Sequence, residues 1–365
     1  MDATQLLVVG LLITCLNRTG AQLGVCYGMN GNNLPSPKEV VDLYKSQNIT
    51  RMRIYYPNQA TILALRDSNI ELLLGVPDSD LQGIASSNST AINWVKSNVL
   101  AYFPSVRFRY ICVGNIISPD SSNAQFVLPA MQNIHNTIAS AGLQNQIKVS
   151  TSIISGLLGT SYPPSQGAFR DDVRSFIDPI ITFLADNGAP LLANLYPYFS
   201  YSSNPEAISL SYALFSSQSV MVQDGKLGYH NLFDALVDAI YSALEKVGGS
   251  TVEIVVSETG WPSAGGTGAS TENARAYNSN LIQHVKGGTP KRPGKAIETY
   301  VFAMFDENQK ITNLELEQHW GLFFPNKQPK YAINFSADPT NSPSTESNKP
   351  YCLNYYIIMH LPSPL

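Results

Sequence analysis

Eight short apolar segments alternate along the chain with stretches of helical periodicity, and this alternation limits the possible fold more than any other feature. The apolar segments are residues 23–27, 52–55, 72–76, 110–114, 147–153, 191–195, 254–256 and 299–305. The helical stretches include residues 37–47, 90–100, 124–141, 233–247 and 271–286. Strands buried on both faces of a parallel sheet are continuous apolar runs. The pattern therefore predicts an α/β fold, a single (β/α)8 TIM barrel over residues 22–335.

The two ends of the chain differ in character from this barrel region. Residues 6–16 are apolar apart from Thr14, and small residues follow at 19–21, which predicts a cleaved signal peptide over residues 1–21 although Asp2 replaces the usual basic residue. The run is too short to span a bilayer. Residues 336–365 begin with a tract rich in Pro, Ser and Asn, and we expect a C-terminal extension that is flexible or processed. A sorting extension and the remnant of a lipid-anchor signal are the alternatives.

A signal peptide implies a secreted protein, either extracellular in the cell wall or vacuolar through the secretory pathway. Exported chains are modified at Asn-X-Ser/Thr triplets, and such triplets begin at Asn48, Asn88 and Asn334. Removal of the signal leaves Cys26, Cys112 and Cys352, an odd number without paired spacing, so no disulfide framework is predicted. Cys26 and Cys112 lie in apolar segments and are expected to be buried and inert. We expect a monomer.

Composition excludes several function classes. The formal net charge is -4 and the basic residues are scattered singly, which argues against nucleic acid as a partner. The 5 histidines show no metal-ligand spacing, and no glycine-rich phosphate loop follows a predicted strand, so neither a metal nor a cofactor is expected. Ser, Asn, Gln and 19 Tyr instead suit a neutral polyhydroxylated ligand.

Polar residues follow several of the predicted strands, and in a TIM barrel the chemistry lies at the carboxyl ends of the strands. The segment EIVVSETGW at residues 253–261 places Glu258 where a buried strand gives way to a turn, either as a catalytic carboxylate or merely at the end of the strand. The other polar residues at strand ends are Tyr27, Tyr55, Tyr56, Asn115, Asn194, Tyr196, Tyr198, Glu307 and Lys310, and Glu317 lies further on. For each tyrosine a structural role at the rim is an alternative to ligand contact. Together the carboxylates, amides and aromatic rings indicate a cleft for a sugar polymer.

Six stretches carry a resemblance to a known family. They are LGVCYGMNGNNLPSP, YICVGN, NLYPYF, VVSETGWPSAGG, FAMFDENQK and WGLF. Over residues 23–335 the chain resembles the plant endo-1,3-β-glucanases of glycoside hydrolase family 17. The resemblance implies a TIM barrel that hydrolyses β-1,3-glucan by a retaining mechanism, with Glu258 as the nucleophile supported by Glu307, Lys310 and Glu317, and with Lys310 keeping Glu307 ionised. The substrate contacts that we predict are Tyr27, Tyr55, Asn115, Asn194, Tyr196, Tyr198 and Phe305.

One position departs from the family pattern. The family's proton donor is the Glu that follows VGN, and here that position is Ile116. A retaining glycosidase needs two carboxyl groups about 5 to 5.5 Å apart, and isoleucine has no proton to donate. Losing a general acid costs on the order of 10² to 10⁴ in rate. Asp120 is a candidate replacement, but such a carboxyl would need a raised pKa to act as an acid, and the surrounding sequence is polar.

Three hypotheses follow. The chain is a secreted endo-1,3-β-glucan hydrolase of reduced activity, a catalytically inactive β-1,3-glucan-binding protein, or the product of a gene copy in decay. Hydrolysis of laminarin separates the first from the second. Whether the protein serves plant defence or wall remodelling, and which chain length and branching it prefers, stay open at this stage.

Overall fold

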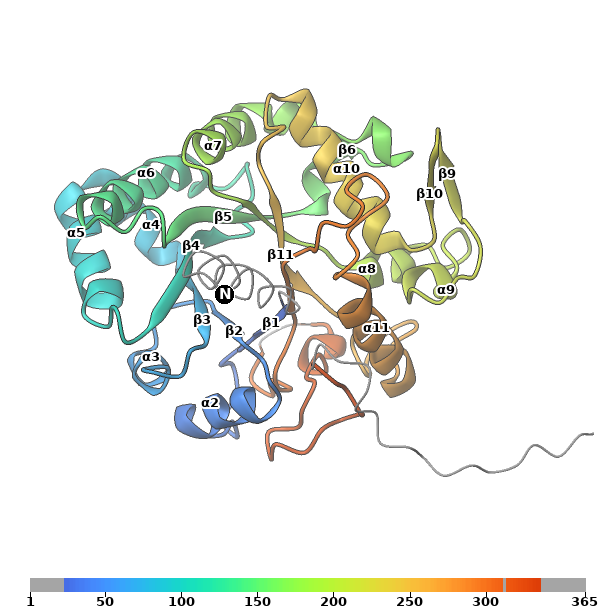
Figure 1. The fold of residues 1–365 in the computed structure, drawn as a ribbon, viewed down its shortest axis with the longest axis horizontal. Coiled ribbons are helices and arrows are strands. Elements are labelled where there is room, and N and C mark those ends of the chain that lie inside the picture. Colours follow the sequence, from blue (N-terminus) through green and yellow to red (C-terminus); the bar gives the residue numbers. More distant parts are fainter. Residues whose placement is uncertain (1–22, 311–312, 336–365) are drawn as a thin grey trace, which may run out of the picture.

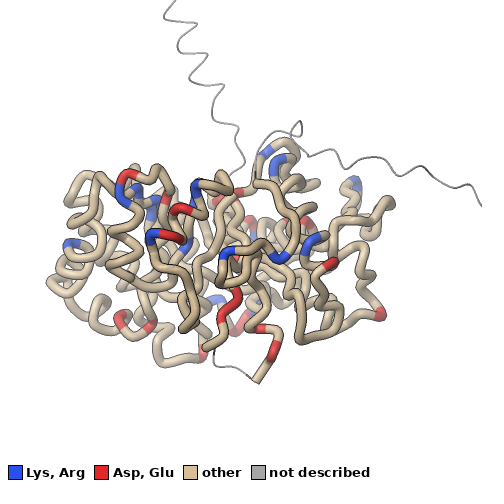
Figure 2. The backbone as a smooth tube through the Cα atoms, turned by 90° about the horizontal axis from the view of Figure 1, so that it is seen from below, with Lys and Arg blue, Asp and Glu red and all other residues tan. Residues whose placement is uncertain are grey.

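A computed structural model describes residues 23–310 and 313–335. The predicted signal peptide (1–21) and C-terminal extension (336–365), together with Cys15 and Cys352, lie outside the described residues. Within the described ranges, no helix combines the length and the apolar character that a bilayer crossing requires. Figure 2 shows Lys and Arg on many separate segments, with acidic residues between them.

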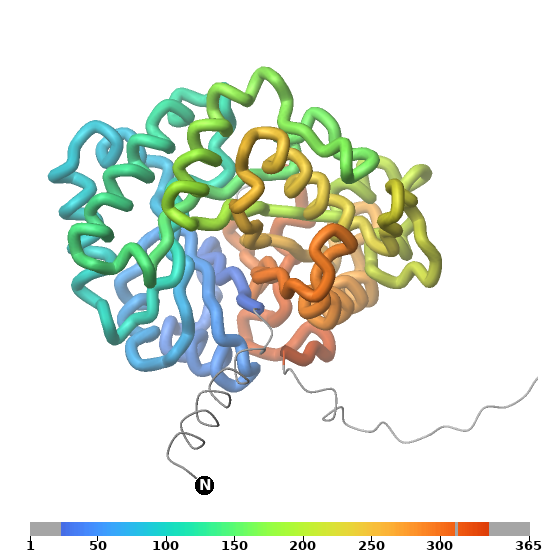
Figure 3. Tube along the Cα trace, turned by 45° about the horizontal axis from the view of Figure 1, so that its top comes forward, coloured from blue at the N-terminus to red at the C-terminus, as the bar shows by residue number. Residues whose placement is uncertain are grey.

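Eight parallel strands close into a barrel, as the alternation of apolar and helical segments predicts (Figure 1). In chain order they are β1 (Leu23–Cys26), β2 (Arg51–Ile54), β3 (Glu71–Val76), β4 (Arg107–Asn115), β5 (Lys148–Ile154), β8 (Leu191–Asn194), β11 (Ile254–Thr259) and β12 (Thr299–Val301). Every predicted apolar segment overlaps one of these strands. Strand β1 pairs with both β2 and β12, so the first and last strands close the ring. Figure 3 shows the blue start and the red end of the chain side by side at this closure.

Helices surround the barrel and cover its outer face (Figure 1). They are α2 (Pro37–Ser46), α3 (Gln59–Ala64), α4 (Leu81–Ser86), α5 (Asn88–Val95), α6 (Ala124–Ser140), α7 (Arg174–Asp186), α8 (Pro197–Ser203), α9 (Leu210–Ala213), α10 (Leu232–Lys246) and α11 (Thr271–His284). The starts follow capping chemistry: Ser36 and Glu39 form a capping box at α2, and the Ser270 side chain accepts a hydrogen bond from the Asn273 amide at α11. The predicted helix at 90–100 divides into α5 and a π-helical segment, Lys96–Leu100.

Two hairpins lie outside the barrel. Strands β6 (Leu158–Thr160) and β7 (Ala168–Phe169) form one, and β9 (Val222–Asp224) and β10 (Leu227–Tyr229) form the other. Neither hairpin was predicted from the sequence. Their strands have only two or three residues, which is too short to show an alternation of apolar and polar residues.

Two barrel strands contain a register shift near their carboxyl ends. In β11 the pairing with β8 shifts between Val256 and Glu258, and in β4 the pairing with β5 shifts between Cys112 and Asn115. Such bulges insert a residue and re-aim the side chains that follow. Both shifts therefore fall directly before the residues that face the candidate site.

Candidate active site

A cavity of about 520 Å³ opens at the carboxyl ends of the barrel strands, within the range that small ligands occupy. Its lining consists of Gly28, Met29, Asn30, Tyr55, Tyr56, Asn115, Ile116, Tyr196, Phe199, Glu258, Phe302, Glu307, Lys310, Glu317 and Trp320. The strand-end residues that we predict from sequence contribute seven members of this set, namely Tyr55, Tyr56, Asn115, Tyr196, Glu258, Glu307 and Lys310. The cavity thus brings together residues that lie far apart along the chain.

Glu258 is held by three side chains at the end of β11. Its Oε1 accepts a hydrogen bond from the Tyr55 hydroxyl, at 2.8 Å, and its Oε2 accepts one from the Tyr196 hydroxyl, also at 2.8 Å. Arg53 Nη1 lies 3.0 Å from Oε1. Burial raises the pKa of both tyrosines well above the ordinary value, so both phenols stay protonated and donate. The carboxylate, only 6% exposed, has a fixed orientation at the edge of the cavity.

Arg53 lies beneath this carboxylate, inside the barrel, and is 1% exposed. Its Nη1 donates to Asn194 Oδ1 at 3.0 Å and to the Ser257 carbonyl at 2.8 Å, and its Nη2 donates to Asn115 Oδ1 at 2.8 Å. The guanidinium carbon also lies 4.7 Å from the centre of the Tyr55 ring. The positive charge is thus shared between one carboxylate and several neutral oxygens. The sequence carries a signal for this role, an arginine inside the buried run RMRI, which our strand-end reasoning missed.

Two further carboxyl groups line the cavity in different electrostatic states. Lys310 Nζ lies 2.8 Å from Glu317 Oε2, which pairs these two residues. Glu307 Oε1 accepts a hydrogen bond from the Asn30 amide at 2.9 Å, and burial raises the pKa of Glu307 more than this hydrogen bond and the charge of Lys310 lower it. The ion pair of Lys310 is therefore with Glu317, which differs from the expectation that Lys310 keeps Glu307 ionised. The reason is the burial of Glu307, which no sequence pattern reports.

An aromatic wall, made of Tyr196, Phe199, Phe302 and Trp320, bounds one side of the cavity. The ring centre of Trp320 lies 5.1 Å from that of Tyr196, 5.8 Å from that of Phe199 and 6.0 Å from that of Phe302. The contacts with Tyr196 and Phe302 are edge-to-face and that with Phe199 is tilted, and such contacts hold the rings against one another. The apolar faces of pyranose rings suit such a surface. Phe199 comes from α8 and Phe302 and Trp320 come from loops, and none of the three was predicted as a contact.

Ile116 follows β4 and occupies the cavity lining with a side chain 38% exposed. Its φ is 58°, in the left-handed region, where a β-branched residue is an outlier. Its amide donates to the Ser152 carbonyl at 3.2 Å, which holds this conformation. Asp120, the candidate replacement acid, is exposed and does not line the cavity. The backbone therefore presents position 116 to the cavity at the cost of strain, and the side chain there is a hydrocarbon.

Four predicted contact residues lie behind the cavity wall instead of in its lining. Asn194 is buried because its amide oxygen accepts hydrogen bonds from Arg53 and Ser257. Tyr198 packs against the rings of Trp261 and Trp320 at 5.1 and 5.7 Å, and Tyr27 packs edge-on against Phe305 at 6.2 Å. All four are less than 4% exposed, namely Tyr27, Asn194, Tyr198 and Phe305. Sequence position at a strand end does not reveal whether a ring faces the cavity or the layer beneath it.

The two cysteines of the described barrel are buried and free. Burial, partly offset by the nearby charge of Arg53, raises the pKa of the Cys26 thiol to about 12, and it raises that of Cys112 as well. The raised pKa disfavours the thiolate at both positions, and the prediction that both cysteines are buried is confirmed.

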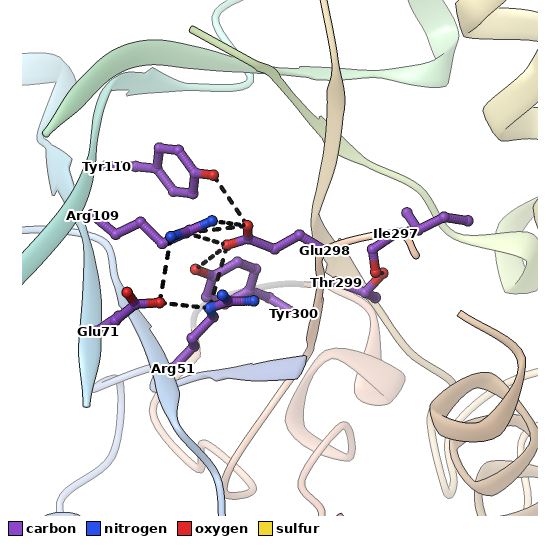
Figure 4. A network of polar contacts seen from close by, with 8 residues as sticks. All are labelled: Arg51, Glu71, Arg109, Tyr110, Ile297, Glu298, Thr299 and Tyr300. Carbon is purple, nitrogen blue, oxygen red and sulfur yellow. Dashed lines mark hydrogen bonds and ion pairs between the residues drawn. The ribbon is translucent and has the colours of Figure 1, made fainter. Parts of the chain in front are cut away.

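A second charged cluster lies at the opposite, amino-terminal end of the barrel (Figure 4). Glu298 accepts hydrogen bonds from Arg109 Nε and Nη2, the shortest 2.7 Å, and from the hydroxyls of Tyr110 and Tyr300, each at 3.1 Å. Arg51 Nε donates to Glu71 at 2.8 Å. A cavity of about 540 Å³ borders this cluster. Opposite charges here are directly paired with one another.

Comparison with known proteins gives one consistent result. The family model described as "Glycosyl hydrolases family 17" matches residues 23–335. A glucan endo-1,3-beta-glucosidase of Vitis vinifera is 61% identical over 334 residues, which are 90% of this chain and 96% of that protein. A basic vacuolar isoform of glucan endo-1,3-beta-glucosidase from Nicotiana plumbaginifolia is 55% identical, covering 95% and 94% of the two chains. The solved structure of CJP38, a beta-1,3-glucanase and allergen of Cryptomeria japonica pollen, is 48% identical with a TM-score of 0.84, covering 87% of this chain and all of that one.

Proposed function

The chain belongs to glycosyl hydrolase family 17, and from this premise we propose that it is a secreted endo-1,3-β-glucanase whose turnover is impaired at a single position. The substrate class is β-1,3-glucan, the polymer that its relatives' names specify. The cavity suits one stretch of such a polymer, because the aromatic wall offers stacking surfaces and the carboxylates offer hydrogen-bond acceptors.

In the proposed reaction Glu258 attacks the anomeric carbon of the bound sugar. Tyr55, Tyr196 and Arg53 hold its carboxylate in place, so little orientational freedom is lost in reaching the transition state. Among the described residues, Oε2 accepts a hydrogen bond from Tyr196 alone, which leaves a lone pair for the attack. The product of this step in a retaining mechanism is a glycosyl ester on Glu258.

The single observation that carries the proposal of impaired turnover is Ile116 in the cavity lining. The departing sugar oxygen needs a proton from the side of the scissile bond that faces away from the nucleophile. Glu307 does not stand on that side, because it follows β12, the neighbour of the strand that carries Glu258. Position 116 follows β4, which lies three strands from β11 around the ring. Glu317 forms an ion pair with Lys310, whose Nζ lies 2.8 Å from its Oε2. Leaving-group protonation and water activation are therefore the steps that fail.

Binding without cleavage is the second candidate function, and Ile116 favours it specifically. The nucleophile, its three supports and the aromatic wall are all in place, so the cavity keeps what recognition requires. Laminarin binding is expected under both proposals. Turnover alone separates an impaired hydrolase from a binding protein.

The test compares laminarin hydrolysis by the parent and by Ile116→Glu. We expect the variant to release reducing sugar faster by roughly 10² to 10⁴, the range of a recovered general acid. Ile92→Glu is the matched control, because Ile92 is exposed to nearly the same degree but lies on α5, outside the cavity. A gain below about tenfold would show that position 116 does not carry the missing acid. Substantial hydrolysis by the parent would remove the claim of impairment.

We further propose that residues 1–21 direct the chain into the secretory pathway and are removed, that residues 22–335 act as a monomeric barrel, and that residues 336–365 are flexible or processed. The vacuolar name of the Nicotiana relative supports this route. Mass spectrometry of the protein purified from its native tissue would measure both termini. An intact N-terminus at Met1 would contradict the proposal.

A further inference from the structure

The cavity retains the nucleophile of a double displacement together with its supporting residues, and it lacks the acid/base group that both halves of the reaction use. Glu258 keeps Tyr55, Tyr196 and Arg53 as hydrogen-bond and charge partners. The acid that would protonate the leaving oxygen is also the base that would activate water in the second half. Isoleucine at position 116 therefore impairs both steps. The impairment applies only to leaving groups that must be protonated and to acceptors that must lose a proton.

From this we propose that the protein is a glycosyl-transfer catalyst for proton-independent reactants: it forms a long-lived glycosyl ester on Glu258 from donors with an acidic leaving group, and passes the glycosyl group to small anionic acceptors. The inference rests on the proposed function, because it requires Glu258 to be the nucleophile. It goes further in assigning an activity, a donor class and an acceptor class that differ from hydrolysis of the polymer.

The first step balances without a general acid. A Glu258 carboxylate oxygen attacks the anomeric carbon and forms an ester C–O bond. The bond between the anomeric carbon and the leaving group breaks, and the electron pair leaves with an aryl oxide such as 2,4-dinitrophenolate. Because this anion is stable in water, no proton is needed at position 116. An ordinary sugar alkoxide would not leave in this way.

The second step selects its acceptor by charge. Water must lose a proton as it attacks the ester, and Ile116 offers no base. An anion such as azide, formate or a thiolate attacks directly: its bond to the anomeric carbon forms, the ester bond breaks, and the Glu258 carboxylate is regenerated. Two inversions give a β-linked product.

The electrostatics of the cavity support entry of an anion. A carboxylate at position 116 would repel an approaching anion, whereas Ile116 presents an exposed hydrocarbon surface. Glu317 also has a direct cationic partner, as Glu258 does. Its negative charge is balanced by the Lys310 ammonium, which lies 2.8 Å away. The Lys310 ammonium also lies 4.3 Å from the centre of the Phe302 ring, within the same lining. An acceptor at the mouth therefore meets less negative charge than it would with glutamate at position 116.

The experiment uses the full chain with 2,4-dinitrophenyl β-laminaribioside as the donor. We expect a burst of about one equivalent of dinitrophenolate per chain, followed by slow release. Intact-mass measurement should show one added laminaribiosyl group, and peptide mapping should place it on Glu258. Sodium azide should accelerate the slow phase by roughly tenfold or more and yield the β-glycosyl azide. Ile116→Glu should turn over without accumulating the ester and respond little to azide.

The outcomes separate this inference from the proposed function. If the parent shows neither a burst nor a mass increase while Ile116→Glu hydrolyses laminarin, the transfer activity is overturned and the hydrolase assignment stands. If the adduct forms on a residue other than Glu258, both fail. If the adduct forms on Glu258 but Ile116→Glu does not hydrolyse laminarin, the transfer activity is supported and the assignment of position 116 as the missing acid is wrong. Glu258→Gln serves as the negative control for the adduct.

Discussion

The two ends of the barrel contain cavities of nearly equal volume, about 520 and 540 Å³, and both are lined by charged residues. They differ in how the charges are paired. At the amino-terminal end Glu298 accepts hydrogen bonds from Arg109, Tyr110 and Tyr300, so its acceptor sites are filled by the protein (Figure 4). At the carboxyl end Glu258 accepts from two phenols and one shared arginine, and it borders open space.

This difference teaches that neither cavity size nor charge count marks the reacting end of a barrel. A carboxylate enclosed by several donors contributes to stability, whereas one with few donors and an open face remains available to a ligand. The two ends are therefore expected to respond to substitution in opposite ways, one in stability and the other in chemistry.

The largest expected effect tests the chemical end. Glu258→Gln should lower the rate of the dinitrophenolate burst by roughly 10³ or more, because the amide is a poor nucleophile. Glu298→Gln, an equal change at the other end, should alter that rate by less than about threefold, since it does not contact the cavity of Glu258. Stopped-flow absorbance measures both. Equal losses in the two variants would break the distinction between the ends.

The second effect tests the structural end. Glu298→Ala leaves the partly exposed Arg109 guanidinium without its bidentate partner and two buried tyrosine hydroxyls without their acceptor, which should cost about 3 kcal/mol. Glu258→Ala should cost less, about 1–2 kcal/mol, because Arg53 keeps Asn115, Asn194 and the Ser257 carbonyl as acceptors. Urea or thermal unfolding ranks the two. A larger loss at Glu258 would reverse our view of which end stabilises the fold.

A third prediction concerns strain at the chemical end. Ile116 adopts a φ of 58°, and asparagine tolerates this region better than a β-branched residue. Ile116→Asn should therefore raise the free energy of unfolding by about 1 kcal/mol. Ile154→Asn is the matched control, because Ile154 is also 38% exposed but has an extended backbone with φ of -107°. Equal changes in the two variants would remove strain as the cause.

The smallest effect distinguishes the ends by pH. Burial raises the pKa of Glu71, but the hydrogen bond from Arg51 and the charges of Arg109 and Arg51 outweigh burial, so the pKa is lowered overall. Its contribution to stability is complete above the ordinary carboxyl pKa and is lost as pH falls through the lowered value. Burial raises the pKa of Glu307, so its contribution is complete below the ordinary pKa and is lost as pH rises through the raised value.

Melting curves of Glu71→Gln and Glu307→Gln between about pH 3 and 7 measure these contributions against the parent. With rising pH the parent should gain stability relative to Glu71→Gln and lose it relative to Glu307→Gln. The same sign of change for both variants would contradict the opposite environments of the two carboxyls.

The fold was predictable because each barrel strand is a continuous apolar run, which the sequence displays directly. The last strand was predicted too long: β12 ends at Val301, whereas the apolar run continues to Phe305 as part of the core. Glu258, Tyr55 and Tyr196 were predictable as candidate site residues because each follows or ends a strand. Their roles are proposals that the experiments above address.

The rest of the site depends on three-dimensional contacts that local patterns do not encode. Arg53 lies inside a buried strand, so the apolar run concealed it. Phe302 and Trp320 reach the cavity from separate loops, and their proximity depends on how these loops fold over the barrel. Lys310 has two carboxylates nearby in sequence, and only geometry shows that it pairs with Glu317.

Because of the register shifts in β4 and β11, the direction of the reacting side chains depends on the number of residues in each strand. Each shift lies upstream of a position that faces the ligand, 116 in one case and 258 in the other. Because side chains alternate between the two faces of a strand, deleting a single residue between the shift and the site would turn the reacting side chain into the wall. Substitutions at these two positions change the reacting side chain but keep its direction. Insertions and deletions nearby change the strand register and turn the side chain away from the cavity. Directed evolution of this scaffold should therefore vary residue identity and leave strand length unchanged.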